Sequence, residues 1–108
     1  MDEIKVVWSD FSLDKIEYIA KRLEQKSLQA AQNVVSAIFN KTKQLETQPL
    51  SGTLEKNLIQ LNLDHRFLLV YNYKLIYRLI NKNTVYITDV FPTENNPEKI
   101  ILRADKTL

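Results

Sequence analysis

The clearest hydrophobic pattern of the chain lies between residues 66 and 91, where apolar runs alternate with short polar or aromatic breaks. The runs read RFLLV, KLIYRLI and TVYITDVF, and they are rich in the β-branched and aromatic residues that strands favour. The break Asn81-Lys82-Asn83 is typical of a hairpin turn, because asparagine tolerates a positive φ. The sequence therefore predicts a three-stranded antiparallel meander.

Side chains alternate between the two faces of a strand, so the loop at residues 71–73 decides which residues share a face. If those three residues form the loop, Arg66 lies opposite Arg78. The first face is then predicted to hold Arg66, Leu68, Lys74, Ile76, Arg78, Ile87 and Asp89. The second face, predicted to be a purely hydrophobic platform, holds Phe67, Leu69, Leu75, Tyr77 and Leu79.

The line of cations formed by Arg66, Lys74 and Arg78 is the candidate functional feature of the first face. Like charges placed directly opposite each other repel, so Arg66 and Arg78 need an anion between them. Asp89, a carboxylate of a partner protein or a phosphate could each supply it. Two interpretations therefore remain: a groove that receives an anionic or peptide partner, and a structural Arg–Asp network on a solvent-exposed face.

The first half of the chain shows a strand pattern followed by two helical patterns. Residues 4–8 (IKVVW) predict a short inner or covered strand, and Ser9 is placed to cap the helix that follows. Apolar residues then recur at helical spacing in two segments, one around Ile16 and one around Ile38, the second of which is capped by Ser27. Their short connection predicts an antiparallel helical hairpin.

These elements predict an α+β fold of two layers. The apolar faces of the hairpin and of the meander both need a cover, and packing one on the other satisfies both. We expect a single domain over residues 1–108, with an N-terminal strand and an antiparallel helical hairpin packed on an antiparallel sheet that ends in the meander. Residues 50–63 are expected to contain a loop, and Asn96 and Pro97 to begin a short C-terminal helix.

Composition narrows the class of protein. The chain has 108 residues, no cysteine and a formal net charge of +2. The acidic start MDEIKVVW and the lack of an apolar run near the ~18 residues of a membrane span predict a cytoplasmic protein without a leader. The mildly basic charge is compatible with a nucleic acid or an acidic protein as partner.

The sequence lacks the residues that most catalytic arrangements require. With one histidine, His65, and no cysteine, there is no zinc-type cluster, so we expect neither a metal nor a cofactor. Asp64 directly precedes His65, and neighbours in a strand point to opposite faces, which disfavours a catalytic pair. The single glycine, Gly52, excludes glycine-rich phosphate-binding loops.

The order of the predicted elements is accompanied by a set of short motifs. These are WS at 8–9, DKIEYI at 14–19, PLSG at 49–52, RFLLV at 66–70, YKLIYRLI at 73–80 and VYITDVF at 85–91. Each motif alone is common, but their order and spacing over nearly the whole chain resemble the RelE/ParE superfamily of bacterial toxins from type II toxin–antitoxin modules.

The resemblance implies a cytoplasmic toxin that a co-expressed antitoxin neutralises and through which it forms oligomers. RelE-like members cut mRNA on the ribosome, whereas ParE-like members, among them plasmid stabilisation proteins, are associated with inhibition of DNA gyrase. By this resemblance Lys74 stands where RelE-like toxins place a catalytic arginine, and Arg66 lies near their lysine-bearing strand. These two residues are the candidate catalytic residues. Leu68 replaces a second lysine, and the segment around Glu94 lacks an arginine that many relatives carry.

The departures from the RelE-like pattern favour the ParE-like side. An acid at Glu94 would repel a scissile phosphate, and metal-free RNA cleavage needs a base, an acid and a cation together. We therefore expect a toxin that acts without enzymatic activity, by binding a protein target such as DNA gyrase. The alternatives are a RelE-like ribosome-dependent endoribonuclease with a degenerate site and a family remnant without toxicity. Lys74 is expected to be a surface side chain whose replacement by alanine changes the free energy of unfolding by less than ~0.5 kcal/mol.

Overall fold

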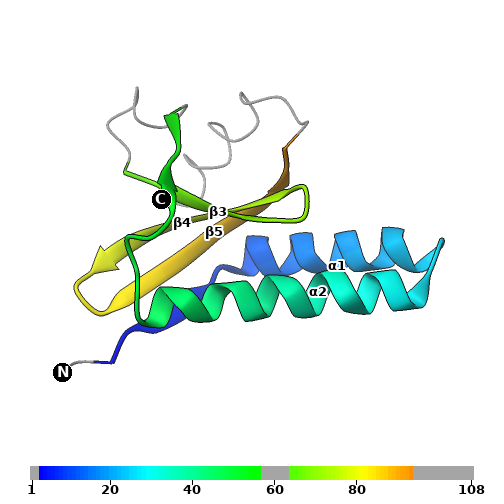
Figure 1. Cartoon of the computed structure of the whole chain (residues 1–108), viewed down its shortest axis with the longest axis horizontal. Helices are drawn as coiled ribbons and strands as arrows, with labels where there is room; N and C mark the ends of the chain where they lie inside the picture. The colour runs from blue at the N-terminus through cyan, green and yellow to red at the C-terminus, as the bar shows by residue number, and fades with distance from the viewer. Residues whose placement is uncertain (1–2, 57–63, 94–108) are drawn as a thin grey trace.

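Two layers make up the fold: a five-stranded sheet and, on one of its faces, a hairpin of two helices (Figure 1). The computed structural model describes residues 3–56 and 64–93. The strands are β1 (Lys5–Trp8), β2 (Thr53–Leu54), β3 (Arg66–Val70), β4 (Tyr73–Asn81) and β5 (Thr84–Pro92). The helices are α1 (Asp10–Glu24), α2 (Leu28–Thr42) and the short 3-10 helix η1 (Lys43–Glu46). The predicted α+β fold is confirmed.

The sheet has the strand order β1-β5-β4-β3-β2, so its two shortest strands form the edges. Strands β3, β4 and β5 pair antiparallel in sequence order, which confirms the predicted meander. Strand β1 pairs in parallel with β5, with Val6 beside Val85, and this makes the sheet mixed. The N-terminal strand is therefore present but lies at an edge. Its apolar residues on both faces suggested an inner or covered strand, whereas Val7 is exposed.

Both long helices begin where a serine caps them. Ser9 Oγ accepts a hydrogen bond from Ser12 N at 3.0 Å, and Ser27 Oγ accepts one from Ala30 N at 3.1 Å. Each bond satisfies an amide that has no partner within its helix. Residues 25–27 connect the two helices, which pack as the predicted antiparallel hairpin (Figure 1).

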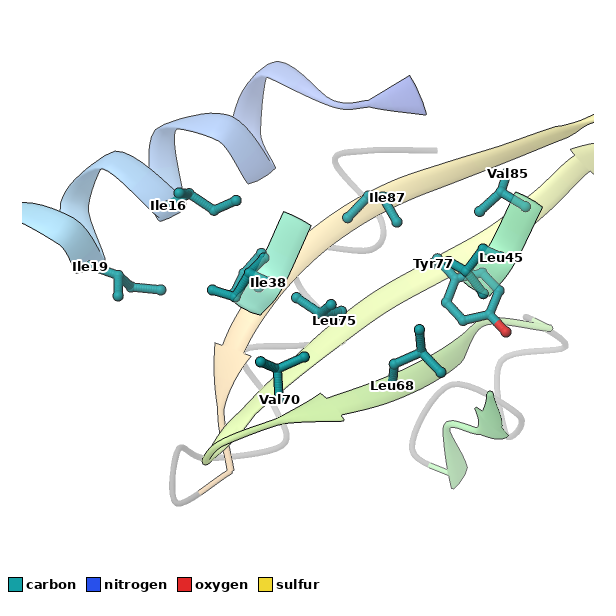
Figure 2. Close-up of a cluster of buried hydrophobic side chains, with 11 residues drawn as sticks. Ile16, Ile19, Ile38, Leu45, Leu68, Val70, Leu75, Tyr77, Val85 and Ile87 are labelled. Atoms are coloured by element: carbon teal, nitrogen blue, oxygen red, sulfur yellow. The ribbon is translucent and has the colours of Figure 1, made fainter. Parts of the chain in front are cut away.

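The core lies between the sheet and the hairpin (Figure 2). The helical elements contribute Ile16, Ile19, Ile38 and Leu45 to it. The strands contribute Leu68, Val70, Leu75, Tyr77, Val85, Ile87 and Val90. Leu75 and Tyr77 come from the face predicted to be buried. Leu68 and Ile87, in contrast, come from the face predicted to be open, and that prediction is wrong.

The turn between β3 and β4 explains the error for β3. Tyr71 adopts a φ of 53°, and Val70 pairs with Tyr73, so the connection is a two-residue turn instead of the predicted three-residue loop. Because successive side chains alternate, a change of one residue in register moves every side chain of β3 to the other face. The assignment of β4 is unaffected.

The corrected register breaks the predicted line of cations. Arg66 lies opposite Tyr77 and Leu68 lies opposite Leu75, both pairs on the helix-facing side of the sheet. Lys74 remains on the opposite side, because it alternates with the core residues of β4. Arg66 and Lys74 therefore do not share a face.

Irregular pairing changes the predicted partners of β5 as well. The register between β4 and β5 shifts twice, as it does at β-bulges. Arg78 consequently lies opposite Tyr86, Asp89 lies opposite Ile76, and Ile87 faces the core. The predicted arrangement, with Arg78 opposite Ile87 and diagonal to Asp89, is wrong for this reason.

Two expectations concern residues outside the described ones. The C-terminal helix predicted at Asn96 and Pro97, and the position of Glu94, fall in residues 94–108. The predicted loop at 50–63 is described only up to residue 56, and that part includes β2. No helix within 3–56 and 64–93 is long and apolar enough to cross a membrane.

Candidate functional site

The sheet face that points away from the helices carries a group of charged and polar side chains around one aromatic ring. On β3 and β4 they occupy the positions that alternate with core residues. Just beyond β2, Glu55 N donates a hydrogen bond to His65 O at 2.9 Å. The Glu55 side chain joins the same face, because its carboxylate contacts Lys74. We call this group the charged cluster. Its members are Glu55, Asp64, His65, Phe67, Lys74 and Arg78.

Lys74 is the centre of the charged cluster. Its Nζ lies 2.9 Å from Glu55 Oε2 and 4.4 Å from the centre of the Phe67 ring. The side chain of Glu55 is only 2% exposed, and that of Lys74 is 22% exposed. A carboxylate removed from water needs a nearby cation, because a buried charge without one is costly. Lys74 is therefore the partner of a buried carboxylate rather than the surface side chain that the sequence predicted.

His65 is fully buried in the same cluster, and neither ring nitrogen has a hydrogen-bond partner among the described residues. Burial, and to a smaller extent the positive charge of Arg78, lowers the pKa of His65 to about 4, while Asp64 opposes the shift. At pH 7 the imidazole is thus neutral and cannot donate a proton as an imidazolium. No three His, Asp or Glu side chains in the described part of the chain could hold a metal ion.

Arg78 is the second cation of the charged cluster. Its Nη2 lies 3.5 Å from Asp64 Oδ1, and the two side chains are 29% and 70% exposed. An ion pair open to solvent contributes ~1 kcal/mol or less to stability. Arg78 Nε has no hydrogen-bond partner within the described residues. The ion pair of Arg78 is therefore longer and more exposed than that of Lys74 with Glu55.

Arg66 forms hydrogen bonds to the loop at residues 50–52, on the helix-facing side of the sheet. Its Nη1 donates to Gly52 O at 2.8 Å and to Leu50 O at 3.3 Å. The Tyr77 hydroxyl accepts a hydrogen bond from Gly52 N at 2.9 Å. Burial raises the pKa of Tyr77 above its usual value, so the hydroxyl stays protonated. Arg66 therefore holds residues 50–52 against the sheet and cannot join Lys74 in one site.

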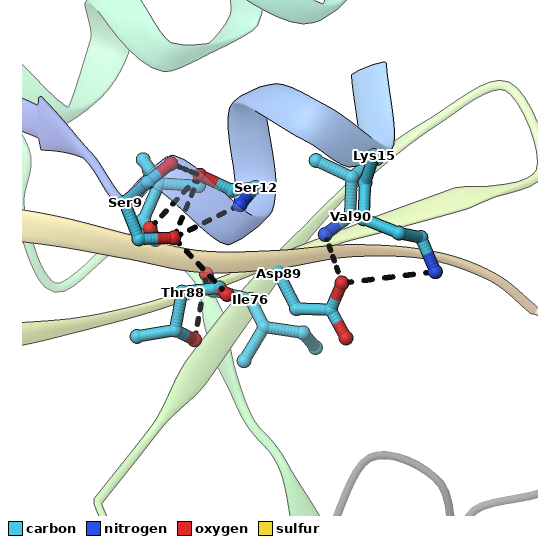
Figure 3. A network of polar contacts seen from close by, with 8 residues as sticks. Ser9, Ser12, Lys15, Ile76, Thr88, Asp89 and Val90 are labelled. Atoms are coloured by element: carbon cyan, nitrogen blue, oxygen red, sulfur yellow. Dashed lines mark hydrogen bonds and ion pairs between the residues drawn. The ribbon is translucent and has the colours of Figure 1, made fainter. Parts of the chain in front are cut away.

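Asp89 also takes a structural position. Lys15 Nζ, on α1, lies 4.0 Å from Asp89 Oδ1, and Val90 N donates to the same oxygen at 2.7 Å (Figure 3). The sequence offered Asp89 as one of three possible anions between Arg66 and Arg78, but Arg78 pairs with Asp64. The carboxylate of Asp89 links helix α1 to the sheet instead.

Two serines complete this link between helix and sheet. Ser12 Oγ donates to Ile87 O at 3.2 Å, and Ser9 Oγ lies 3.4 Å from Thr88 O (Figure 3). Both carbonyls belong to the part of β5 where β1 ends and the register with β4 shifts. Ile87 O also accepts a backbone hydrogen bond from Ser9 N at 3.0 Å. Because buried backbone carbonyls need partners, the two hydroxyls add side-chain donors at the point where β1 ends.

The residues predicted to line one groove thus lie on two different faces of the sheet. Lys74, Ile76 and Arg78 share the face that points away from the helices, but Ile76 is buried and lines no open groove. Glu55 is a site residue that the sequence did not reveal. It lies 19 positions before its partner Lys74, in an irregular stretch where no periodicity assigns a face. An isolated acid in a weakly polar segment was the only available signal.

A second candidate surface lies between the two helices, on the side of the hairpin that faces solvent. A groove of about 310 Å³ is lined there by Ala20, Glu24, Ala31, Gln32, Val35 and Ser36. Exposed apolar side chains continue the two rows at helical spacing, with Leu13 on α1 and with Leu28 and Phe39 on α2. Ala20, Ala31 and Val35 give the groove a partly apolar lining, bordered by the polar Glu24, Gln32 and Ser36, and such an amphipathic groove suits an amphipathic helix.

A family model described as "ParE toxin of type II toxin-antitoxin system, parDE" matches residues 6–97. The chain belongs to the ParE toxin family. The match extends from β1 through the meander, so it includes both the charged cluster and the helical groove.

A solved structure supports the same fold. A chain of the chromosomal ParDE toxin–antitoxin system from P. aeruginosa superposes with a TM-score of 0.68 and 14% sequence identity. The alignment covers 84% of the present ParE-family chain and 97% of that chain. At this identity the likeness shows the fold alone. None of the curated proteins compared with the chain matches it.

Proposed function

We propose that this ParE-family protein is a toxin that a cognate antitoxin neutralises, and that it acts by binding a protein target, with DNA gyrase as the expected target. The ion pair between Lys74 and Glu55 supports a binding function more than any other single observation. Lys74 occupies the position where a ribonuclease of the wider superfamily needs a free cation. In this chain a buried carboxylate neutralises it.

The rest of the charged cluster also argues against RNA cleavage. Metal-free cleavage needs a general base, a general acid and a cation at one place. His65 is neutral at pH 7 and buried, and Arg66 lies on the other side of the sheet. Binding requires no such constellation, because a few desolvated contacts supply most of the affinity of an interface.

The groove between α1 and α2 is the surface on which we place the antitoxin. The occupant is an amphipathic helix of the antitoxin, since a groove between helices accepts apolar side chains at positions i, i+4 and i+7. The family description pairs this kind of toxin with an antitoxin, and the groove is bordered by exposed apolar side chains. This location replaces the one predicted on the meander, where Leu68, Ile76 and Ile87 are buried.

Induction of the protein in a bacterial host separates the two functions. The binding function predicts that reporter plasmids lose negative supercoils and that mapping of translated mRNA reveals no codon-specific cuts. Lys74→Ala is the matched variant, and its effect on plasmid topology should equal that of the wild type. Ribosome-dependent cuts made by the wild type and lost in Lys74→Ala would establish the ribonuclease instead. Growth without either effect would identify a family member that has lost its toxicity.

A further inference from the structure

Strand β1 lies at an edge of the described sheet but has the composition of an inner strand. Val6, Val7 and Trp8 are apolar, and Lys5 carries its single charge. Natural edge strands are blunted by shortness, proline, a bulge or several charges, because an open edge pairs with other chains. The opposite edge strand, β2, has only two residues. β1 has four residues, pairs regularly with β5 and contains no proline.

The backbone of β1 directs one set of hydrogen-bonding groups away from the sheet. Lys5 N donates to Asn83 O at 2.8 Å, and every second residue of a parallel strand faces its neighbour in this way. Val7 therefore faces β5 as well. The amide and carbonyl groups of Val6 and Trp8 point in the opposite direction, where no strand of the described sheet lies.

These outward groups match a second copy of β1 in antiparallel orientation. About a two-fold axis at Val7, Val6 of one protomer lies opposite Trp8 of its partner, and such a pair exchanges both of its hydrogen bonds. Val6 and Trp8 both face the helical layer, so the side chains that lie opposite each other share a face. Val7, which is 42% exposed, then lies opposite Val7 of its partner on the other face. The edge is therefore self-complementary.

The charges at the two ends of β1 favour the same orientation. Lys5 at the start of β1 is exposed, and so is Asp10, which begins α1 directly after the strand. Antiparallel pairing brings the Lys5 end of one protomer to the Asp10 end of its partner on both sides of the axis. The ring centroid of Phe39, a side chain that is 38% exposed, lies 4.9 Å from that of Trp8. Phe39 thus extends the apolar surface from β1 into the helical layer.

We propose that the protein forms a homodimer through an antiparallel pair of β1 strands, with Val7 on the two-fold axis. The pair joins the two sheets into one continuous sheet and places both helical layers on the same side of it. This dimer needs no antitoxin, in contrast to the oligomer that the family resemblance implies, and it goes beyond the proposed function.

Cysteine cross-linking tests the position of the axis, because the chain has no cysteine of its own. In such a pair the Cα atoms of the two Val7 residues lie about 4.5 Å apart, so Val7→Cys permits a disulfide between protomers. Lys5→Cys is the matched control on the same face of β1, and its two thiols would lie about 13 Å apart along the strands. On oxidation of the full chain, non-reducing electrophoresis should show dimer formation at least about ten-fold faster for Val7→Cys.

Analytical ultracentrifugation of the wild type over a series of concentrations measures the dimer without any replacement. Val7→Lys places like charges directly opposite each other and should raise the Kd of the dimer at least about ten-fold. Leu69→Lys is the control, because Leu69 is an exposed apolar residue of β3, far from β1 in the sheet. Its replacement should leave the Kd within about two-fold of the wild-type value.

Three results overturn the proposal. The first is a wild type that stays monomeric at every concentration, and the second is an equal rate of cross-linking for Val7→Cys and Lys5→Cys, which indicates random collisions. The third is a monomer in which the cognate antitoxin protects the Val7→Cys thiol from alkylation, since the edge then receives a strand of the antitoxin. Gyrase inhibition is a separate measurement, so the proposed function and this inference can fail independently.

Discussion

Gly52 is the residue at which the loop before β2 meets the sheet most closely. A Cβ atom built on it would lie 2.6 Å from the Tyr77 hydroxyl oxygen and 2.7 Å from the Phe67 carbonyl oxygen. Because the second of these atoms belongs to the backbone, the sheet itself would have to move. We expect Gly52→Ala to lower the free energy of unfolding by about 1–3 kcal/mol, as overpacking of a filled site does. Urea unfolding measures this, with Ser51→Ala, an exposed neighbour, as the control. Equal stability of the two variants would contradict the packing described for this loop.

The buried ion pair of Lys74 changes the expected effect of Lys74→Ala on the free energy of unfolding. Lys74→Ala removes the ammonium that lies 2.9 Å from the buried carboxylate of Glu55, and the loss of one member of such an ion pair is more costly than the loss of a surface side chain. We expect a decrease of about 1–3 kcal/mol in the free energy of unfolding, below the full effect for a buried pair because Lys74 is partly exposed. Lys82→Ala, on the exposed turn between β4 and β5, should stay within about 0.5 kcal/mol of the wild type. Chemical denaturation that finds the two variants equal would refute the burial of this pair.

His65 makes the stability depend on pH. Its pKa is about 4 in the folded chain and 6.5 in an unfolded one. Between these values the unfolded state binds more protons, so stability is complete above pH 6.5 and decreases as the pH falls through 4. The contribution is on the order of 3 kcal/mol. His65→Phe should flatten the stability curve between pH 4 and 6.5, because the chain has one histidine. A slope that survives this replacement would assign the effect to other groups.

At the scale of elements, the helical hairpin carries exposed apolar side chains on its solvent-facing side. Leu28 lies at the start of α2 and is 59% exposed, and Leu69 lies on the opposite face of the sheet and is 53% exposed. Leu28→Asp should weaken the complex with the cognate antitoxin by about ten-fold or more, since it places a charge on an exposed apolar position at the edge of the groove. Leu69→Asp should change the affinity by less than about three-fold. Isothermal titration calorimetry distinguishes them, and a reversed order would place the antitoxin on the sheet.

The sequence predicted the elements better than their faces. Periodicity and capping serines locate both helices and the three strands of the meander, because these signals are local. The face of Arg66 could not be predicted in the same way, since it depends on a turn of two or three residues at Tyr71. A positive φ at a tyrosine has no sequence signal of the kind that glycine or asparagine gives. An error of one residue in the length of this turn placed Leu68 on the open face in the prediction, whereas Leu68 lies in the core.

The candidate site was less predictable than the fold for a related reason. Its central contact joins Glu55, from an irregular segment, to Lys74, from a regular strand. Such a pair is visible only when the edge strand β2 is placed beside β3, and β2 has two residues. Lys74 and Arg78 were recognised because strand periodicity assigns them to one face. The burial of His65 follows from tertiary packing that no local pattern encodes.

At the scale of the whole molecule, the sheet separates two surfaces of different character. The helical hairpin covers one face of the sheet (Figure 1). The groove lies on this hairpin, and the charged cluster lies on the other face of the sheet. Replacements in one surface should therefore leave the other unchanged, because sites without shared contacts act additively. This separation allows antitoxin binding and the charge balance around Lys74 to be tested independently.

Inhibition of purified DNA gyrase tests the central claim, a toxin that acts by binding a protein, most directly. Supercoiling of a relaxed plasmid is followed while the wild type or a folded Lys74→Ala variant is titrated. The account predicts inhibition by both proteins at concentrations within about five-fold of each other, because a contact at the edge of an interface contributes ~1 kcal/mol or less. The antitoxin should restore supercoiling. Full gyrase activity at saturating wild-type protein, together with ribosome-dependent mRNA cleavage that Lys74→Ala abolishes, would contradict it.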